Sequence, residues 1–218
     1  MAEEYLDEII LKARKQRLEQ TLDEDVDLER DLPEDYLQTV TIGDGMASIK
    51  IPAFMGDMPA EWAEQKYEYE PRPEIIKTSA EGNVNFTFSL LDCTVAPSAL
   101  MTALQDCKRG MHRVMPELVY YDEGEESING IKVCWYEFSN NAAGGKIYNF
   151  QFFAATEKTL MGSLNCPYGN HEVWVKVAKL CMKTLRGKAY DGEAEQDFTG
   201  RAKTDGANVL SATASVDE

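Results

Sequence analysis

The sequence predicts an α+β fold in which one antiparallel sheet of about six to eight strands is covered by helices, an α/β/α sandwich. Several segments alternate apolar and polar residues with the period of two that a strand requires. The turns between them are short, which favours antiparallel pairing because parallel strands need long crossovers. Two segments show helical periodicity instead, one between the predicted strands and one after them.

The first third of the chain predicts a helix, a hairpin and a long connection. Residues 3–22 carry an imperfect apolar stripe of helical spacing, and the acidic residues 22–36 are expected to link this helix to the core. Residues 37–52 predict two short strands around Gly43-Asp44-Gly45, a strong hairpin signal. Residues 53–74 hold three prolines and several aromatic residues, which indicates a partly helical connection.

The middle of the chain predicts a strand, a helix and a strand pair. Residues 84–91 alternate as a half-buried strand, and residues 96–115 switch to helical period. The apolar face of this helix comprises Leu100, Leu104, Cys107, Met111 and Val114. Residues 117–124 and 128–138 predict paired strands around a Glu/Gly-rich turn. The carboxylates of that region are expected to be solvated, not an acid/base pair: Asp122, Glu123, Glu125 and Glu126.

The last strands and the final helix follow. Tyr148–Cys166 predicts a hairpin with a turn at residues 156–159, and its aromatic residues of both parities predict helices on both faces of the sheet. Asn170 is a candidate N-cap for a helix that extends to about Arg186, with Gly187 as its C-cap. The stripe of this helix comprises Trp174, Val177, Ala178, Cys181 and Leu185.

Composition divides the chain into an acidic N-terminal helix and linker (1–36), an α+β domain (37–187) and a disordered tail (188–218). Most of the net charge of −16 lies at the two ends. Residues 1–36 hold 13 acids and 5 bases, and residues 188–218 hold 7 acids and 3 bases. No charge run is basic, so a nucleic-acid partner is not expected. No apolar run is long enough for membrane insertion, and the acidic N-terminus does not resemble a secretory signal, which favours a cytoplasmic location.

Cys166 and His171 are the sharpest catalytic candidates, because a thiol nucleophile needs a nearby base and a feature that lowers its pKa. Cys166 shares parity with Leu160 and Leu164, however, and this alternation points it towards the apolar face of its strand. The structural interpretation is favoured, and no catalytic residue is assigned. The two histidines and five cysteines lack the spacing of a zinc site, and no phosphate-binding glycine motif occurs, so neither metal nor cofactor is expected.

The connection at residues 55–72 is the candidate partner-binding region. It gathers residue types that are enriched in protein-binding surfaces: Met55, Met58, Trp62, Tyr67, Tyr69 and Arg72. The alternative is a loop that folds over the sheet edge and completes the core.

Four stretches resemble the PsbP-like fold group, which includes the Ran-binding Mog proteins and bacterial domains of unknown function. These stretches are MASIKIPAFMGDMP, KYEYEPRPEIIKTSAEGNVNFTFSLLD, NGIKVCWYEFSN and GKIYNFQFFAATEKTLMGSLNC. The resemblance covers about residues 40–187. It implies the sandwich fold. It also implies a non-enzymatic function, since members of the group mostly bind a protein partner, assist a membrane complex or act as chaperones and adaptors.

The first functional hypothesis is therefore a non-enzymatic cytoplasmic protein-binding domain, an adaptor or chaperone for a secreted or membrane-complex protein. The alternative is a small-ligand-binding protein or hydrolase with a cavity near Cys166 and His171. A third hypothesis is self-association through the apolar stripe of residues 3–22.

Overall fold

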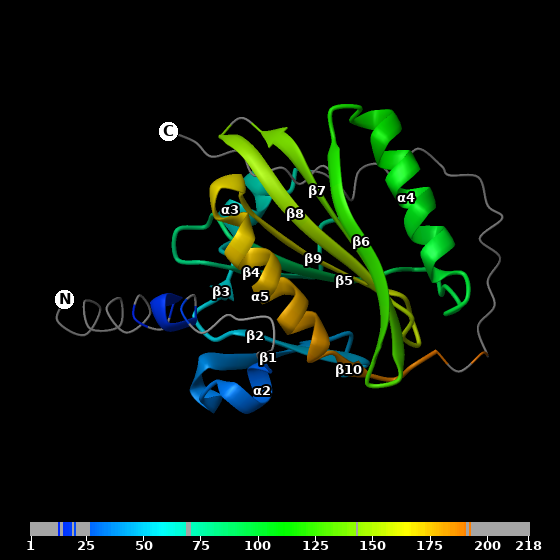
Figure 1. The fold of residues 1–218 in the computed structure, drawn as a ribbon, viewed down its shortest axis with the longest axis horizontal. Coiled ribbons are helices and arrows are strands. Elements are labelled where there is room, and N and C mark those ends of the chain that lie inside the picture. Colours follow the sequence, from blue (N-terminus) through cyan, green and yellow to red (C-terminus); the bar gives the residue numbers. More distant parts are fainter. Residues whose placement is uncertain are drawn as a thin grey trace.

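A seven-stranded antiparallel sheet forms the centre of the protein (Figure 1). The computed structural model describes residues 27–68, 71–142 and 144–190, together with residues 13, 15–18, 20 and 192. The strand order is β3-β4-β5-β9-β8-β7-β6. The strands are β3 (Gly56–Asp57), β4 (Ile75–Thr78), β5 (Asn85–Leu90), β6 (Val119–Ile128), β7 (Ile131–Ala142), β8 (Gly145–Ala154) and β9 (Leu160–Pro167). The predicted antiparallel α+β architecture is confirmed.

A second, three-stranded sheet lies beside the first. The predicted hairpin at residues 37–52 forms β1 (Leu37–Ile42) and β2 (Ala47–Pro52), and Gly43, Asp44 and Gly45 all have positive φ at its turn. The third strand is β10 (Arg186–Gly187), which pairs with β2. Gly187 thus belongs to a strand and is not the predicted C-cap, because the preceding helix ends at Lys183.

Two helices cover opposite faces of the main sheet. On one face, α5 (His171–Lys183) packs on even-numbered residues of β8 and β9, and on the other, α4 (Leu100–Val114) packs on β7 and β8 (Figure 1). The alternation is visible in β7, where Val133 belongs to the α5 side and Cys134 to the α4 side. Aromatic residues of both parities are therefore core residues on two faces, as the sequence predicts.

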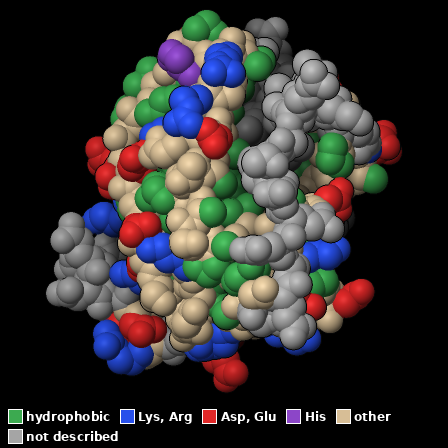
Figure 2. Space-filling model, turned by 90° about the vertical axis from the view of Figure 1, so that its right-hand side faces the viewer, with side chains coloured by type: hydrophobic (Ala, Val, Ile, Leu, Met, Phe, Trp, Pro, Cys, Tyr) green, Lys and Arg blue, Asp and Glu red, His purple; other side chains and the backbone are tan. Residues whose placement is uncertain are grey.

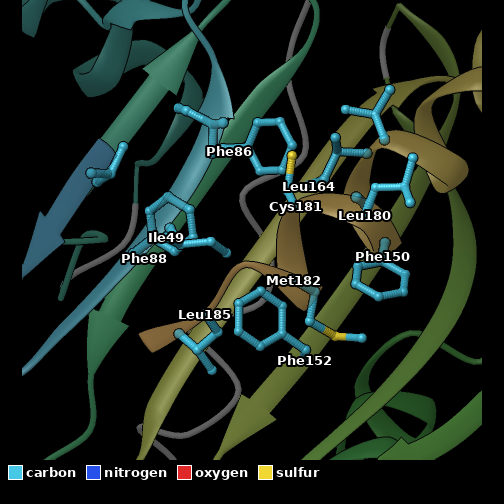
Figure 3. Close-up of a cluster of buried hydrophobic side chains, with 14 of the residues drawn as sticks. Ile49, Phe86, Phe88, Phe150, Phe152, Leu164, Leu180, Cys181, Met182 and Leu185 are labelled. Carbon is cyan, nitrogen blue, oxygen red and sulfur yellow. The ribbon is translucent and has the colours of Figure 1, made fainter. Parts of the chain in front are cut away.

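The core under α5 is the larger of the two and is continuous with the small sheet. All five residues of the predicted stripe lie in this core, four on α5 and Leu185 just after its end, and Phe86, Phe88 and Phe150 meet them from the sheet (Figure 3). Ile49 of β2 joins the same cluster. Asn170 stands directly before α5, but its side chain makes no capping hydrogen bond. The expected side-chain cap is therefore absent from α5.

Two further expectations about this region are corrected. Strand β5 was expected to be half-buried, yet Asn85 and Thr87 are as buried as its phenylalanines. This is possible because Asn85 accepts a hydrogen bond from Thr78 (2.6 Å) and donates one to Asn165 (2.8 Å), which satisfies its buried amide. On α4, Val114 is 59% exposed, although the predicted apolar face included it.

The acidic run after Tyr121 is part of strand β6 and not of a turn. The strand continues to Ile128, and the chain reverses at Asn129-Gly130, where both residues have positive φ. Asn-Gly is the strongest two-residue hairpin signal, and it outweighs the low strand propensity of the acidic residues. On this edge strand Asp122, Glu123 and Glu125 are exposed and each forms an ion pair with a lysine, whereas Glu126 is half-buried.

The described part of the N-terminal segment is helical and contacts the main core. Leu18, at 3% exposure, lies in the cluster under α5. The short helix α2 (Leu28–Asp31) adds Leu28, and Leu32 follows it into the same cluster. The 3₁₀ helices η1 (Glu34–Tyr36) and η2 (Tyr168–Asn170) and the helix α3 (Ala60–Lys66) complete the described elements. No helix among these residues is long and apolar enough to cross a membrane.

Candidate functional site

A pocket of about 530 Å³ lies between the first two turns of α5 and the strands β6, β7 and β8. It lies on the α5 side of the main sheet. Its volume falls within the range of about 300–1,000 Å³ that ligand sites occupy. It is lined by Tyr121, Glu137, Tyr148, His171, Glu172, Val173, Val175 and Lys176.

Two polar side chains of the pocket are buried. Glu137 is 8% exposed and Tyr148 is 1% exposed. The carboxylate of Glu137 forms an ion pair with Lys179 of α5, with 2.6 Å between Oε1 and Nζ. The hydroxyl of Tyr148 neighbours the Glu137 carboxylate but makes no hydrogen bond of good geometry to any described residue. A buried hydroxyl without a partner lacks the hydrogen bonds that it would make in water, which costs about 1–3 kcal/mol.

The electrostatic environment keeps this hydroxyl protonated. Burial, followed by the negative charge of the neighbouring Glu137, raises the pKa of Tyr148 far above its ordinary value. The phenol therefore stays neutral throughout the physiological range. It can donate one hydrogen bond, and its oxygen can accept others from a molecule that enters the pocket.

Aromatic rings form the walls around this hydroxyl. The ring of Tyr148 lies 5.3 Å from that of His171 and 6.3 Å from that of Tyr121, measured between centroids. Tyr168 of η2 stacks on His171 at 4.4 Å. Lys146 lies over the Tyr168 ring and donates a hydrogen bond to the Tyr121 hydroxyl (3.0 Å). The walls thus combine flat apolar surfaces with polar edges.

His171 has a defined tautomer in this arrangement. Its Nδ1 lies 2.7 Å from the carbonyl oxygen of Tyr168, and a carbonyl oxygen only accepts, so Nδ1 carries the proton. In the neutral ring, Nε2 is then a hydrogen-bond acceptor. Position 171 is the first residue of α5, and the tight η2 turn before it holds the imidazole in place.

The proposed thiol–imidazole pair does not have the properties of a nucleophile and its base. Cys166 is fully buried, and burial raises the pKa of its thiol to about 12. A catalytic cysteine needs the opposite shift. His171 lines the pocket, whereas Cys166 does not. The pocket thus lies beside His171, and Cys166 is packed in the core.

The residues of the predicted partner-binding region separate into core and surface. Met55 is 1% exposed and Tyr67 is 4% exposed, so both are core residues. Met58 and Arg72 are half-buried, and Arg72 Nε donates a hydrogen bond to the Tyr67 carbonyl (2.9 Å). Trp62, at 38%, is the exposed member and lies over the turn at Gly82. Tyr69 lies outside the described residues.

Sequence reasoning identified His171 but not its neighbours in the pocket. Tyr121 and Tyr148 were assigned to strands, and Glu137 was not singled out. A signal was nevertheless present, since Glu137 is the one charged residue within WYEFS, a run of otherwise uncharged strand residues. A carboxylate at such a position is rarely buried without a partner or a function.

Other chemistry is limited within the part of the chain that the structure describes. It contains no group of three or more His, Cys, Asp or Glu side chains placed to hold a metal ion. All five cysteines are free. On the face shown in Figure 2, basic and acidic side chains are intermixed, and the hydrophobic ones form small separate groups.

No protein-family model and no curated protein matches this chain. Among solved structures, cyanobacterial PsbP (CyanoP) from Synechocystis sp. PCC 6803 matches with a TM-score of 0.53 at 12% identity, over 72% of this chain and 95% of that one. A protein from Bacteroides thetaiotaomicron VPI-5482 gives 0.45 at 11% identity, over 73% of this chain and 51% of that one. LpqN, involved in cell envelope biogenesis of Mycobacterium tuberculosis, matches with a TM-score of 0.45 at 13% identity, over 68% of this chain and 88% of that one.

The match to cyanobacterial PsbP shows that this chain has the PsbP-like fold. The resemblance stated from the sequence is thereby confirmed for the fold. At 12% identity the match concerns architecture alone, and function must be argued from the site.

Proposed function

We propose that this chain is a non-enzymatic cytoplasmic protein-binding domain, an adaptor or chaperone for a secreted or membrane-complex protein, and that the pocket beside α5 is its recognition site. One observation carries the proposal: the buried Tyr148 hydroxyl makes no well-formed hydrogen bond to the described residues and lies at a pocket of about 530 Å³. A bound group that hydrogen-bonds to this hydroxyl recovers the free energy lost on its burial. Such a gain favours binding over a purely structural role.

The rim of the pocket supports a protein as the partner. Tyr121 is 43% exposed, and Glu172 and Lys176 are also exposed on the outer side of α5. Tyr121 belongs to β6, which is an edge strand of the sheet that the described residues form, so the pocket lies beside that edge. An aromatic anchor site surrounded by a polar rim is the usual anatomy of a protein interface.

The contact region moves away from the Met55–Arg72 connection in this proposal. Met55 and Tyr67 are occupied with core packing, so they are not available to a partner. Trp62 remains available as a secondary contact, since more than a third of its surface is exposed.

A small-ligand-binding protein is the second candidate. The pocket volume favours it, because about 530 Å³ accommodates a small organic molecule. A hydrolase that uses Cys166 is not favoured, because burial holds that thiol in its protonated form.

A site-specific photo-crosslinker distinguishes the two candidates. We would place a photoreactive residue at the exposed position of Lys176, on the rim, and at the exposed position of Arg113 on α4 as the matched control. In extracts of the source cell, the proposal predicts a discrete protein adduct from position 176 only. Equal adducts from both positions, or none from either, would contradict it. Native mass spectrometry of the same protein would reveal a retained small molecule if the second candidate is correct.

A further inference from the structure

We propose that the pocket takes a positively charged side chain, arginine or lysine, from a basic segment of the partner. This inference rests on the proposed function, since it gives the chemistry of the protein segment that the pocket recognises. Three features of the pocket support it: the charges of the side chains that line it, its hydrogen-bond acceptors, and its aromatic side chains.

The side chains that line the pocket carry one more negative than positive charge, although Lys146 and Lys179 lie beside it. Two carboxylates, Glu137 and Glu172, line it together with one ammonium group, Lys176. Lys179 pairs with Glu137 at 2.6 Å, but it also lies 3.5 Å from Asp122, so one positive charge serves two carboxylates. The whole chain carries a net charge of −16, which attracts a basic segment over longer distances.

The polar atoms of the pocket are suited to accept hydrogen bonds. His171 uses Nδ1 on the Tyr168 carbonyl, so Nε2 is the ring nitrogen that can accept a hydrogen bond when the ring is neutral. The Tyr148 oxygen has free lone pairs, and its own proton can turn towards the Glu137 carboxylate. A guanidinium or ammonium group offers several donors and no acceptor, so it complements these atoms.

The aromatic walls favour the same ligand class. The Tyr148 ring centroid lies 6.3 Å from that of Tyr121 and 5.3 Å from that of His171, and all three side chains line the pocket. A cation over an aromatic face is attracted by its quadrupole, and a guanidinium also stacks as a plane. Lys146 already makes such a contact with Tyr168, 3.8 Å from the ring centroid, at the edge of this cluster.

The start of α5 is the opposing influence, because a helix N-terminus attracts anions. Here its first turn contains Glu172, whose carboxylate opposes an incoming negative charge. An anionic ligand is therefore the outcome that the test must be able to detect.

The test is a nuclear magnetic resonance titration of the full chain with three glycine–serine peptides that differ only at their centre, which is arginine, citrulline or glutamate. Citrulline keeps the shape of arginine and removes its charge. The arginine peptide should saturate shifts at the amides of Tyr121, Tyr148 and Glu172, the citrulline peptide should bind at least about tenfold more weakly, and the glutamate peptide should cause no saturable shift.

Two variants complete the experiment. Glu172→Gln is expected to lower the affinity for the arginine peptide by about threefold to tenfold. Glu117→Gln changes an exposed carboxylate outside the pocket and should leave this affinity unchanged. Citrulline or glutamate binding as tightly as arginine would overturn the inference, and so would the absence of any shift at the pocket.

The failures of the two proposals are distinguishable. If no peptide binds but position 176 still crosslinks to a protein, the cation inference fails and the protein-binding function stands. If free arginine amide binds as tightly as the arginine peptide, the pocket recognises a small cation, and the protein-binding function fails.

Discussion

Tyr148 lies directly opposite Cys166 in the antiparallel pairing of β8 and β9. Both side chains therefore point to the α5 side of the sheet, where the Tyr148 ring borders the pocket and the thiol is packed in the core. This relationship explains why a cavity exists near Cys166 although the cysteine itself takes no part in it.

The first prediction concerns thiol reactivity. Cys93 and Cys107 are partly exposed, whereas Cys134, Cys166 and Cys181 are buried. In the folded protein at pH 7.5, Cys166 should react with a maleimide no faster than Cys181, because burial raises the pKa of both thiols and also blocks access. Mass spectrometry of labelled peptides measures the rates, with a urea-unfolded sample as the control. Labelling of Cys166 at the rate of a free thiol would restore the nucleophile hypothesis.

The second prediction concerns the contact between strands β8 and β9. Gly162 lies opposite Phe152, and a methyl group at position 162 would overlap the Phe152 ring. Gly162→Ala should therefore lower the free energy of unfolding by about 1–3 kcal/mol. Gly169→Ala is the matched control, because a methyl group there meets no atom within 4 Å.

A smaller side chain at position 152 should relieve the overlap with a methyl group at position 162. In the Phe152→Leu background, Gly162→Ala should be less destabilising, and urea denaturation of the four variants gives the coupling free energy. Equal costs of Gly162→Ala in both backgrounds would show that the two side chains do not meet as described.

The third prediction separates core from surface in the 53–74 connection. Met55→Ala should lower the free energy of unfolding by about 2–5 kcal/mol, because the Met55 side chain is fully buried. Trp62→Ala should cost at most about 1 kcal/mol, since Trp62 is partly exposed and lies over a surface turn. Chemical denaturation tests both. A large loss of stability in Trp62→Ala would place Trp62 in the core and remove it as a secondary contact.

The fourth prediction concerns alkaline pH. Burial raises the pKa of Cys166 from 9.0 to about 12, so the folded state retains a proton that the unfolded state loses. The stabilisation by this neutral thiol is complete below pH 9 and is lost as pH rises towards 12. Above pH 9 the free energy of unfolding should therefore fall, with a contribution from Cys166 that approaches about 1.4 kcal/mol per pH unit.

The variant Cys166→Ala isolates this contribution from other groups that titrate in the same range. Its stability should fall less steeply than that of the wild type between pH 9 and pH 11, as measured by urea denaturation with a reducing agent present. Parallel curves would mean that the Cys166 pKa is not raised.

The fold was predictable where the local pattern and the tertiary packing agree. The Gly43-Asp44-Gly45 turn and the stripe of α5 were identified because each signal is local and strong. The end of α5 was placed too late, since the periodic pattern does not show that Arg186 and Gly187 pair with β2. That pairing depends on contacts between residues about 140 positions apart.

The pocket was only partly predictable, because its residues come from β6, β7, β8 and α5. Spacing along the chain singled out Cys166 and His171, but the register of the paired strands decides which side chains meet in the pocket. The β7–β8 register brings Glu137 close to Tyr148, and the sequence alone does not reveal that register. The exposure of Met55 and Trp62 was equally unpredictable, because both residues lie in a connection without a repeating pattern.

The most direct test of the account is the variant Tyr148→Phe, studied for stability and binding in the same preparation. If the unpaired hydroxyl serves recognition, its removal should leave the free energy of unfolding unchanged or raise it by about 1–3 kcal/mol. The same variant should bind the arginine peptide about fivefold to tenfold more weakly, because it has lost one hydrogen bond to the peptide. A destabilised variant that binds the peptide as tightly as the wild type would contradict the account.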